Sequence, residues 1–185
     1  MKAKSGYFST FCRGGVCGVS EGLMLAMLAI VLAIPASAGD AGFKGVSAQI
    51  VVKSDPQRIF EAIRELRHQG KVSVTVLSSE GNTDTLEEKW DDLPIIGHAF
   101  CRYRETYVPF ERIEYKMIDS DHFKAFEGRW TLTRQNDGST LVALSSYVQT
   151  DLNVPFGHQL TNFTTMRNIH KRLDEVKRLC ERRPG

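Results

Sequence analysis

The sequence of 185 residues has only four cysteines and lacks the short motifs that mark common catalytic sites. It has no nucleophile elbow, no glycine-rich phosphate loop and no catalytic-triad signature. Because it also has no EF-hand loop and no HExxH-type helix, we predict no metal site and no cofactor, and interpret the polar segment 119–122 as a turn. We assign no catalytic residue, so a binding protein is favoured over an enzyme.

The sequence also has little excess of charge of either sign. Residues 1–38 hold three of the 24 lysines and arginines and one of the 22 aspartates and glutamates. Residues 39–185 therefore hold 21 basic and 21 acidic side chains. Nucleic-acid-binding domains carry a basic surface, so we predict no nucleic-acid partner. The one local basic excess is interpreted as the solvated end of a helix, with transient membrane contact left open; it comprises Lys171, Arg172, Lys177, Arg178, Arg182 and Arg183.

Residues 1–38 have the pattern of a secretory signal peptide. A basic lead precedes an uncharged apolar run at 23–34, which is shorter than the about 20 residues that span a membrane. Ala36 and Ala38 place small residues where a signal peptidase reads. We therefore expect cleavage after Ala38, a mature domain of residues 39–185 and a periplasmic or secreted location. A retained N-terminal anchor is the alternative.

The cysteines divide between the two parts of the chain. Cys12 and Cys17 would leave with the signal peptide, so only Cys101 and Cys180 remain. An oxidising compartment permits them to pair, but the sequence does not show whether they come within bonding distance. Cys101 has no activating neighbour in the sequence, which argues against a nucleophilic thiolate.

The mature part has the pattern of a strand, a helix, a run of strands and a long helix. The alternating segment 46–52 ends near Asp55, which can cap a helix that starts at Pro56 and covers 56–67. Alternation and turn residues, including the pair Asp137 and Gly138, then predict strands at 72–76, 85–90, 100–108, 112–118, 125–134 and 140–149.

After residue 155 the apolar residues recur every three or four positions, which predicts a helix over 156–181. The positions of this stripe are Phe156, Leu160, Phe163, Met166 or Arg167, His170, Leu173, Val176 and Cys180. A helix of about seven turns can cover a small sheet. The predicted fold is therefore α+β: a curved antiparallel sheet of about six or seven strands wrapped around a long C-terminal helix. We expect the protein to be a monomer.

Two segments of the sequence resemble a known family. VVKSDPQRIF at 51–60 and FKAFEGRWTL at 123–132 are similar to the polyketide cyclase/dehydrase and lipid-transport branch of the START-like helix-grip (SRPBCC) superfamily. The resemblance implies a helix-grip fold and a hydrophobic ligand such as a lipid, quinone or polyketide. The superfamily often has two short helices after the first strand, whereas the distance from Arg67 to Val72 leaves little room for a second.

One face of each strand and one stripe of the last helix must point into the same space, which predicts a ligand cavity. Tyrosine and tryptophan have polar ends that suit a lined cavity, and Gly128 leaves room beside the strand. The predicted ligand-binding residues are Tyr103, Tyr115, Met117, Phe126, Gly128, Trp130, Phe163, Met166 and His170. A solid core is the alternative. For His170, a buried, hydrogen-bonded histidine is favoured over ligand contact or a general base.

Three functions remain open on the sequence alone. The first is an exported carrier of a small hydrophobic molecule. The second is a polyketide cyclase or dehydratase, against which export argues. The third is an envelope interaction module with a filled core. A measured cavity separates the third function from the other two.

Overall fold

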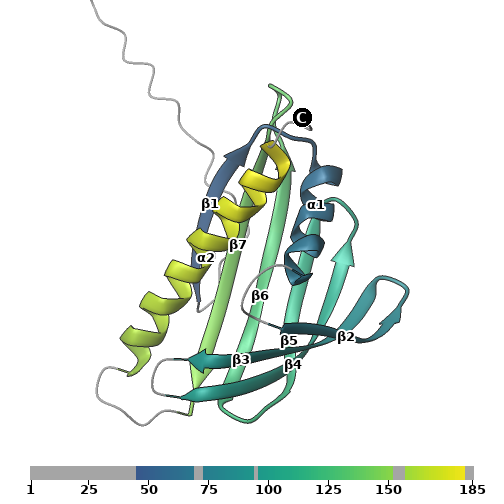
Figure 1. Ribbon diagram of the computed structural model, residues 1–185. Helices are drawn as coiled ribbons and strands as arrows, with labels where there is room; N and C mark the ends of the chain where they lie inside the picture. The colour runs from purple at the N-terminus through teal and green to yellow at the C-terminus, as the bar shows by residue number, and fades with distance from the viewer. Residues whose placement is uncertain (1–44, 69–72, 94–95, 152–156, 182–185) are drawn as a thin grey trace, which may run out of the picture. The chain divides into compact units, whose positions relative to one another are not determined.

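A computed structural model gives the structure of residues 45–68, 73–93, 96–151 and 157–181 (Figure 1). The predicted signal peptide and its cleavage site lie outside these residues, as do Phe156, Arg182 and Arg183 of the predicted last helix and basic cluster. Among the described residues, no helix has both the length and the hydropathy needed to cross a membrane.

Seven strands form one antiparallel sheet in the order β1-β7-β6-β5-β4-β3-β2. The strands are β1 (Val46–Val52), β2 (Ser73–Glu80), β3 (Thr83–Leu93), β4 (Gly97–Val108), β5 (Arg112–Ser120), β6 (Phe123–Arg134) and β7 (Thr140–Thr150). The helices are α1 (Pro56–Glu65), the short 3-10 helix η1 (Leu66–His68) and α2 (Gly157–Glu181). This architecture confirms the predicted α+β fold.

Local signals in the sequence place the ends of these elements. The Oδ1 atom of Asp55 accepts a hydrogen bond from the backbone N of Arg58 at 3.0 Å, which caps the helix that Pro56 begins. Gly138 adopts a φ of 83° in the β6–β7 turn, a conformation that favours glycine. The predicted helix over 56–67 continues beyond α1 as η1.

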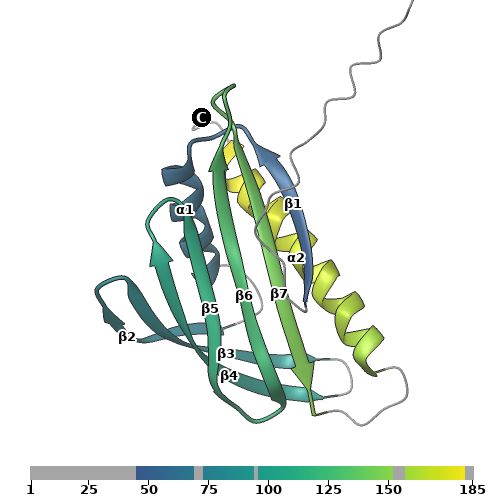
Figure 2. The same ribbon diagram turned by 180° about the vertical axis from the view of Figure 1, so that it is seen from behind.

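The sheet is strongly curved. The strands β2, β3 and β4 run across the direction of β6 and β7, while α2 lies over β1 and β7 (Figures 1 and 2). Irregular register in β3 after Trp90, in β4 at Tyr103 and in β6 after Phe123 supports this bend, because a bulge increases local twist. The sheet and α2 therefore enclose a space on the concave side.

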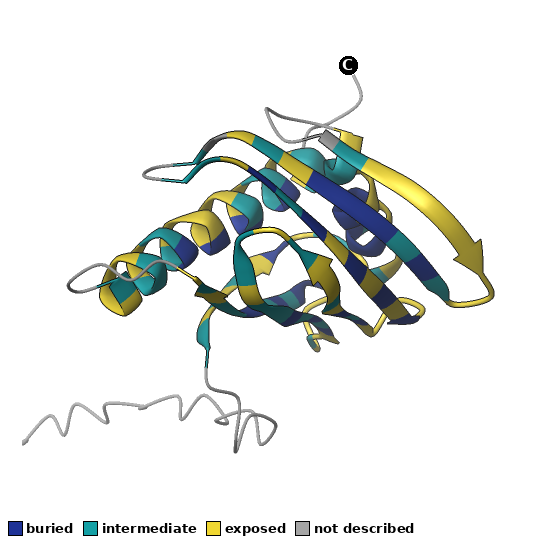
Figure 3. Cartoon of the chain, turned by 90° about the horizontal axis from the view of Figure 1, so that it is seen from below, coloured by how far each residue is buried: buried dark blue, intermediate teal, exposed yellow. Residues whose placement is uncertain are grey.

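The short helix α1 fills one end of that space. Its Ile59 and Ile63 are buried in the same core as Val52 of β1 and Leu173 and Val176 of α2. Figure 3 shows the buried positions on the inward sides of the strands and helices. At this end the layers pack closely.

The two cysteines of the described chain are free thiols. Cys101 is buried on β4, whereas Cys180 is half-buried on α2, with its Sγ atom 3.9 Å from the carbonyl oxygen of Arg58. The disulfide that the sequence left open is absent between these two residues.

Candidate ligand-binding pocket

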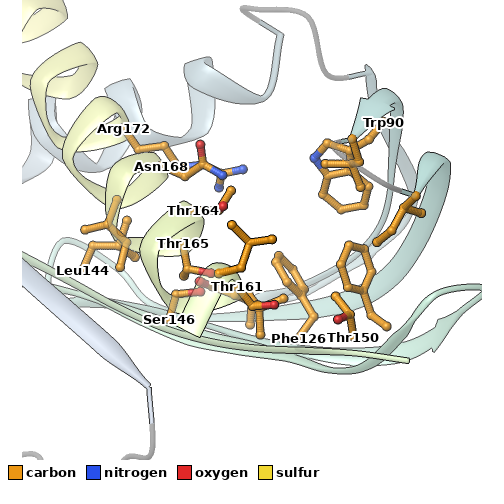
Figure 4. A pocket seen from close by; sticks show the side chains of 17 residues that line it. Trp90, Phe126, Leu144, Ser146, Thr150, Thr161, Thr164, Thr165, Asn168 and Arg172 are labelled. Carbon is orange, nitrogen blue, oxygen red and sulfur yellow. The ribbon is translucent and has the colours of Figure 1, made fainter. Parts of the chain in front are cut away.

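The end of the concave space away from α1 is hollow. It contains a cavity of about 150 Å³ between the sheet and α2 (Figure 4). A cavity of this size can hold a group about as large as benzene. Residues of β3, β5, β6, β7 and α2 surround it, and they form two walls of different chemistry.

The first wall is aromatic and aliphatic. Trp90 of β3 meets Phe123 of β6 edge to face, with ring centroids 5.3 Å apart. Phe126 of β6 lies 5.0 Å from Tyr115 of β5 and 5.3 Å from the buried Tyr103 of β4, measured between ring centroids. Such ring pairs stabilise one another beyond simple burial. They present a firm apolar surface to whatever occupies the cavity.

The second wall consists of small polar side chains. Its residues on β7 and α2 are Ser146, Thr150, Thr161, Thr164, Thr165 and Asn168. Figure 4 shows Thr164 and Asn168 on the α2 side of the cavity, with Trp90 on the opposite side. Short hydroxyl side chains leave space where leucine or phenylalanine would fill it, and they offer hydrogen bonds to oxygen atoms of a ligand.

A charged group lies at the inner end of the cavity, next to the packed core. Arg172 of α2 lines the cavity, and its Nη2 atom donates a hydrogen bond to Oε1 of Glu88 on β3 at 3.0 Å. The hydroxyl of Tyr103 donates to the other carboxylate oxygen of Glu88 at 3.2 Å. This cluster connects α2 to the opposite side of the sheet, across the cavity.

Burial perturbs the titration of these groups. Burial alone would lower the pKa of Arg172, but attraction to Glu88 reverses the effect and leaves the pKa raised. Burial, and then the negative charge of Glu88, raises the pKa of Tyr103 well above its usual value. Burial also raises the pKa of Tyr115 to about 12. The arginine is therefore charged and both tyrosines are neutral at physiological pH.

A second buried charge cluster lies near η1. Arg67 contacts both Asp84 of β3, at 2.8 Å between Nη1 and Oδ2, and Glu105 of β4. Asp84 also accepts a hydrogen bond from Ser79 at 2.5 Å. This cluster joins η1 to the sheet, and none of these four residues lines the cavity between sheet and α2.

The structure separates the predicted site residues into groups. Tyr115 and Phe126 line the cavity. Tyr103 and Trp130 are buried in the adjoining core, where Tyr103 holds Glu88. Met117 packs beside the core and borders a separate polar hollow. Contact of any of these residues with a ligand remains a prediction.

Three predicted residues on α2 are placed differently from the expectation. Phe163 is 68% exposed, Met166 is half-buried outside the cavity lining, and His170 is exposed. The interpretation of His170 as a buried histidine is therefore wrong. The inward stripe of this part of the helix contains Thr161, Thr164, Thr165, Asn168 and Ile169. Apolar periodicity predicted Leu160, which also lines the cavity, but missed the polar positions because residues that line a cavity need not be apolar.

The expectation that Gly128 leaves open room is also wrong. A Cβ atom at this position would lie 2.3 Å from the hydroxyl oxygen of Tyr115 and 2.3 Å from the carbonyl oxygen of Ser145. Gly128 and Tyr115 are opposite each other in the β5–β6 register, so the tyrosine ring lies over the glycine. The glycine permits close packing of Tyr115, and a larger residue there would displace the ring.

Glu88 and Arg172 are site residues that the sequence analysis missed. Arg172 was assigned to a solvated basic face, whereas it borders the cavity and pairs with a carboxylate that is 1% exposed. The two residues are 84 positions apart, so no local pattern reveals the pair. The available signal was helical spacing, since Arg172 lies three residues after Ile169 and four before Val176, which are both apolar.

The sequence matches no protein-family profile and no curated protein. Solved structures nevertheless share the fold. A protein from Thermus thermophilus, TTHA0849, aligns with a TM-score of 0.60 and 17% identity over 73% of this chain and 95% of its own. The Zhui aromatase/cyclase from Streptomyces sp. R1128 aligns with a TM-score of 0.59 and 13% identity over 76% and 94%.

A START superfamily protein from Mycobacterium smegmatis aligns with a TM-score of 0.57 and 18% identity, over 72% of this chain and 97% of its own. At these identities the likeness concerns the fold. The described part of the chain therefore has the START-like helix-grip fold, as the resemblance implied, which is also the fold of aromatase/cyclase proteins.

Proposed function

We propose that this chain is an exported binding or carrier protein for a small hydrophobic molecule such as a lipid, a quinone or a polyketide-like compound. The observation that carries the proposal is the cavity between sheet and α2, which has an aromatic wall and is bordered by residues of five elements. Burial of a ligand's apolar surface there is favourable by roughly 25 cal/mol per Å². The predicted signal peptide supports export.

A carrier fits the cavity better than a cyclase or dehydratase. Among the described residues that line it, Tyr115 and Arg172 are the titratable ones. With its pKa raised to about 12, Tyr115 is a weak proton donor at neutral pH. An arginine paired with Glu88 holds its proton. The lining therefore suits binding and orientation more than proton transfer.

The proposal can be tested by filling the cavity. Benzene, followed by chemical-shift titration, should bind the wild type and bind Thr164→Phe at least tenfold more weakly, because Thr164 faces the empty space. Arg167→Phe adds the same ring at an exposed position of α2 and is the matched control. Equal binding by all three proteins, with unchanged circular dichroism, would contradict a ligand in this cavity.

Export requires a separate measurement. N-terminal sequencing of the protein recovered from its own compartment should begin at Gly39, which follows the predicted cleavage site. Membrane-bound protein with an intact Met1 would instead support the retained anchor.

A further inference from the structure

The hydrogen-bonding capacity of Arg172 exceeds what the protein uses. A guanidinium carries five N–H donors in a rigid plane. Among the described residues, Glu88 is the one hydrogen-bond partner of Arg172, through Nη2. The Arg172 side chain is 42% exposed, and it borders the cavity. Its remaining donors are therefore accessible to an acceptor atom on a ligand.

Glu88 already balances the positive charge of Arg172, whereas the hydrogen-bond donors of Arg172 are only partly used. Glu88 is 1% exposed and is held on its second oxygen by Tyr103, so it is a fixed counter-ion. A ligand carboxylate would add an unpaired negative charge beside a neutral ion pair whose carboxylate, Glu88, is buried, which is costly where water is partly excluded. Arg67 cannot compensate, because it does not line the cavity and Asp84 and Glu105 already contact it. A carbonyl oxygen accepts a hydrogen bond without adding charge.

We propose that the pocket selects a neutral ligand that presents a carbonyl oxygen to Arg172, and discriminates against carboxylates such as fatty acids. This inference rests on the proposed binding function and names its ligand class. The ligand places a flat apolar body against Trp90 and Phe126, and the hydroxyls of α2 and β7 face its edge. Ketones, quinones and lactones have this chemistry, whereas a fatty acid lacks both the neutral head and the flat body.

Three small probes of nearly equal size separate these possibilities. Ethylbenzene is apolar, acetophenone carries a neutral carbonyl and benzoate carries a carboxylate. In chemical-shift titrations of the wild type, acetophenone should bind at least fivefold more tightly than benzoate. In the double variant Glu88→Gln, Arg172→Met, acetophenone should lose at least fivefold in affinity while ethylbenzene changes less than twofold.

The single variant Glu88→Gln tests the charge argument directly. Removal of the counter-ion leaves Arg172 with uncompensated charge, so benzoate should gain at least tenfold in affinity while acetophenone changes less than threefold. If wild type binds none of the probes, ethylbenzene included, the binding function itself fails. If ethylbenzene binds but benzoate exceeds acetophenone in the wild type, the pocket stands and the inference is overturned; this ranking needs no variant.

Discussion

The two ends of α2 lie against the same sheet but meet different neighbours. Near the C-terminal end, Leu173 and Val176 pack against Ile59 and Ile63 of α1 in a continuous core. The N-terminal half faces the cavity instead. At a rise of about 1.5 Å per residue, α2 is about 38 Å long and α1 only about 15 Å. The cavity exists because α1 is too short to cover the whole sheet. A binding site in the cavity therefore depends on the difference in length between α1 and α2.

The largest expected effect is at the packed end. Leu173→Ala should lower the free energy of unfolding by about 2–5 kcal/mol, because the side chain is only 2% exposed and its removal leaves a cavity in the core. Phe163→Ala removes more atoms from the same helix, yet should change stability by less than about 0.5 kcal/mol, since Phe163 lies in solvent. Urea denaturation measures both. A larger loss for Phe163→Ala would reverse the comparison.

Substitutions that add volume should likewise cost more stability at the packed end than beside the cavity. Ala62 of α1 is fully buried at the packed end, so Ala62→Leu forces its neighbours apart and should cost about 1–3 kcal/mol. Thr164→Leu adds a side chain of the same type beside empty space and should cost less than about 1 kcal/mol. Thermal unfolding of the two variants gives the measurement. Similar losses would show that the cavity collapses in solution.

The smallest effect is on alkaline stability. Burial raises the pKa of the Cys101 thiol from 9.0 to about 12 and that of the Cys180 thiol to about 11. Because each folded-state pKa lies above the unfolded value, the neutral thiol contributes stability that is complete below about pH 9 and is lost as the pH rises toward the folded pKa. Wild-type stability should therefore fall as the pH rises above about 9.

The stability of Cys101→Ala should fall less steeply over this range, and that of Cys180→Ala should also fall less steeply, but only up to a lower pH because the folded pKa of Cys180 is about 11. Urea denaturation at several pH values measures the slope separately from any packing loss, which shifts the whole curve. A Cys101→Ala slope as steep as that of the wild type would mean that this thiol does not set the alkaline limit.

Much of the fold was predictable, and the site was predictable only in part. The capped helix at Pro56, the turn at Gly138 and the alternating strands follow from contacts between near neighbours in the chain. Tyr115 and Phe126 were assigned to the inner face by the same alternation, and both line the cavity. Gly128 was assigned to the correct face, but the ring of Tyr115 that covers it belongs to another strand.

The types and order of the elements could be read from local patterns, because a period of two or 3.6 residues is a local property of the backbone. Which residues of α2 face inward near the cavity depends on the packed fold, since Thr161 and Thr164 carry no apolar signal. It also decided that the partly exposed Arg172 pairs with the buried carboxylate of Glu88. Their charges become stable inside the protein only when the curved sheet brings the two residues together, and no spacing within a strand or a helix encodes that encounter.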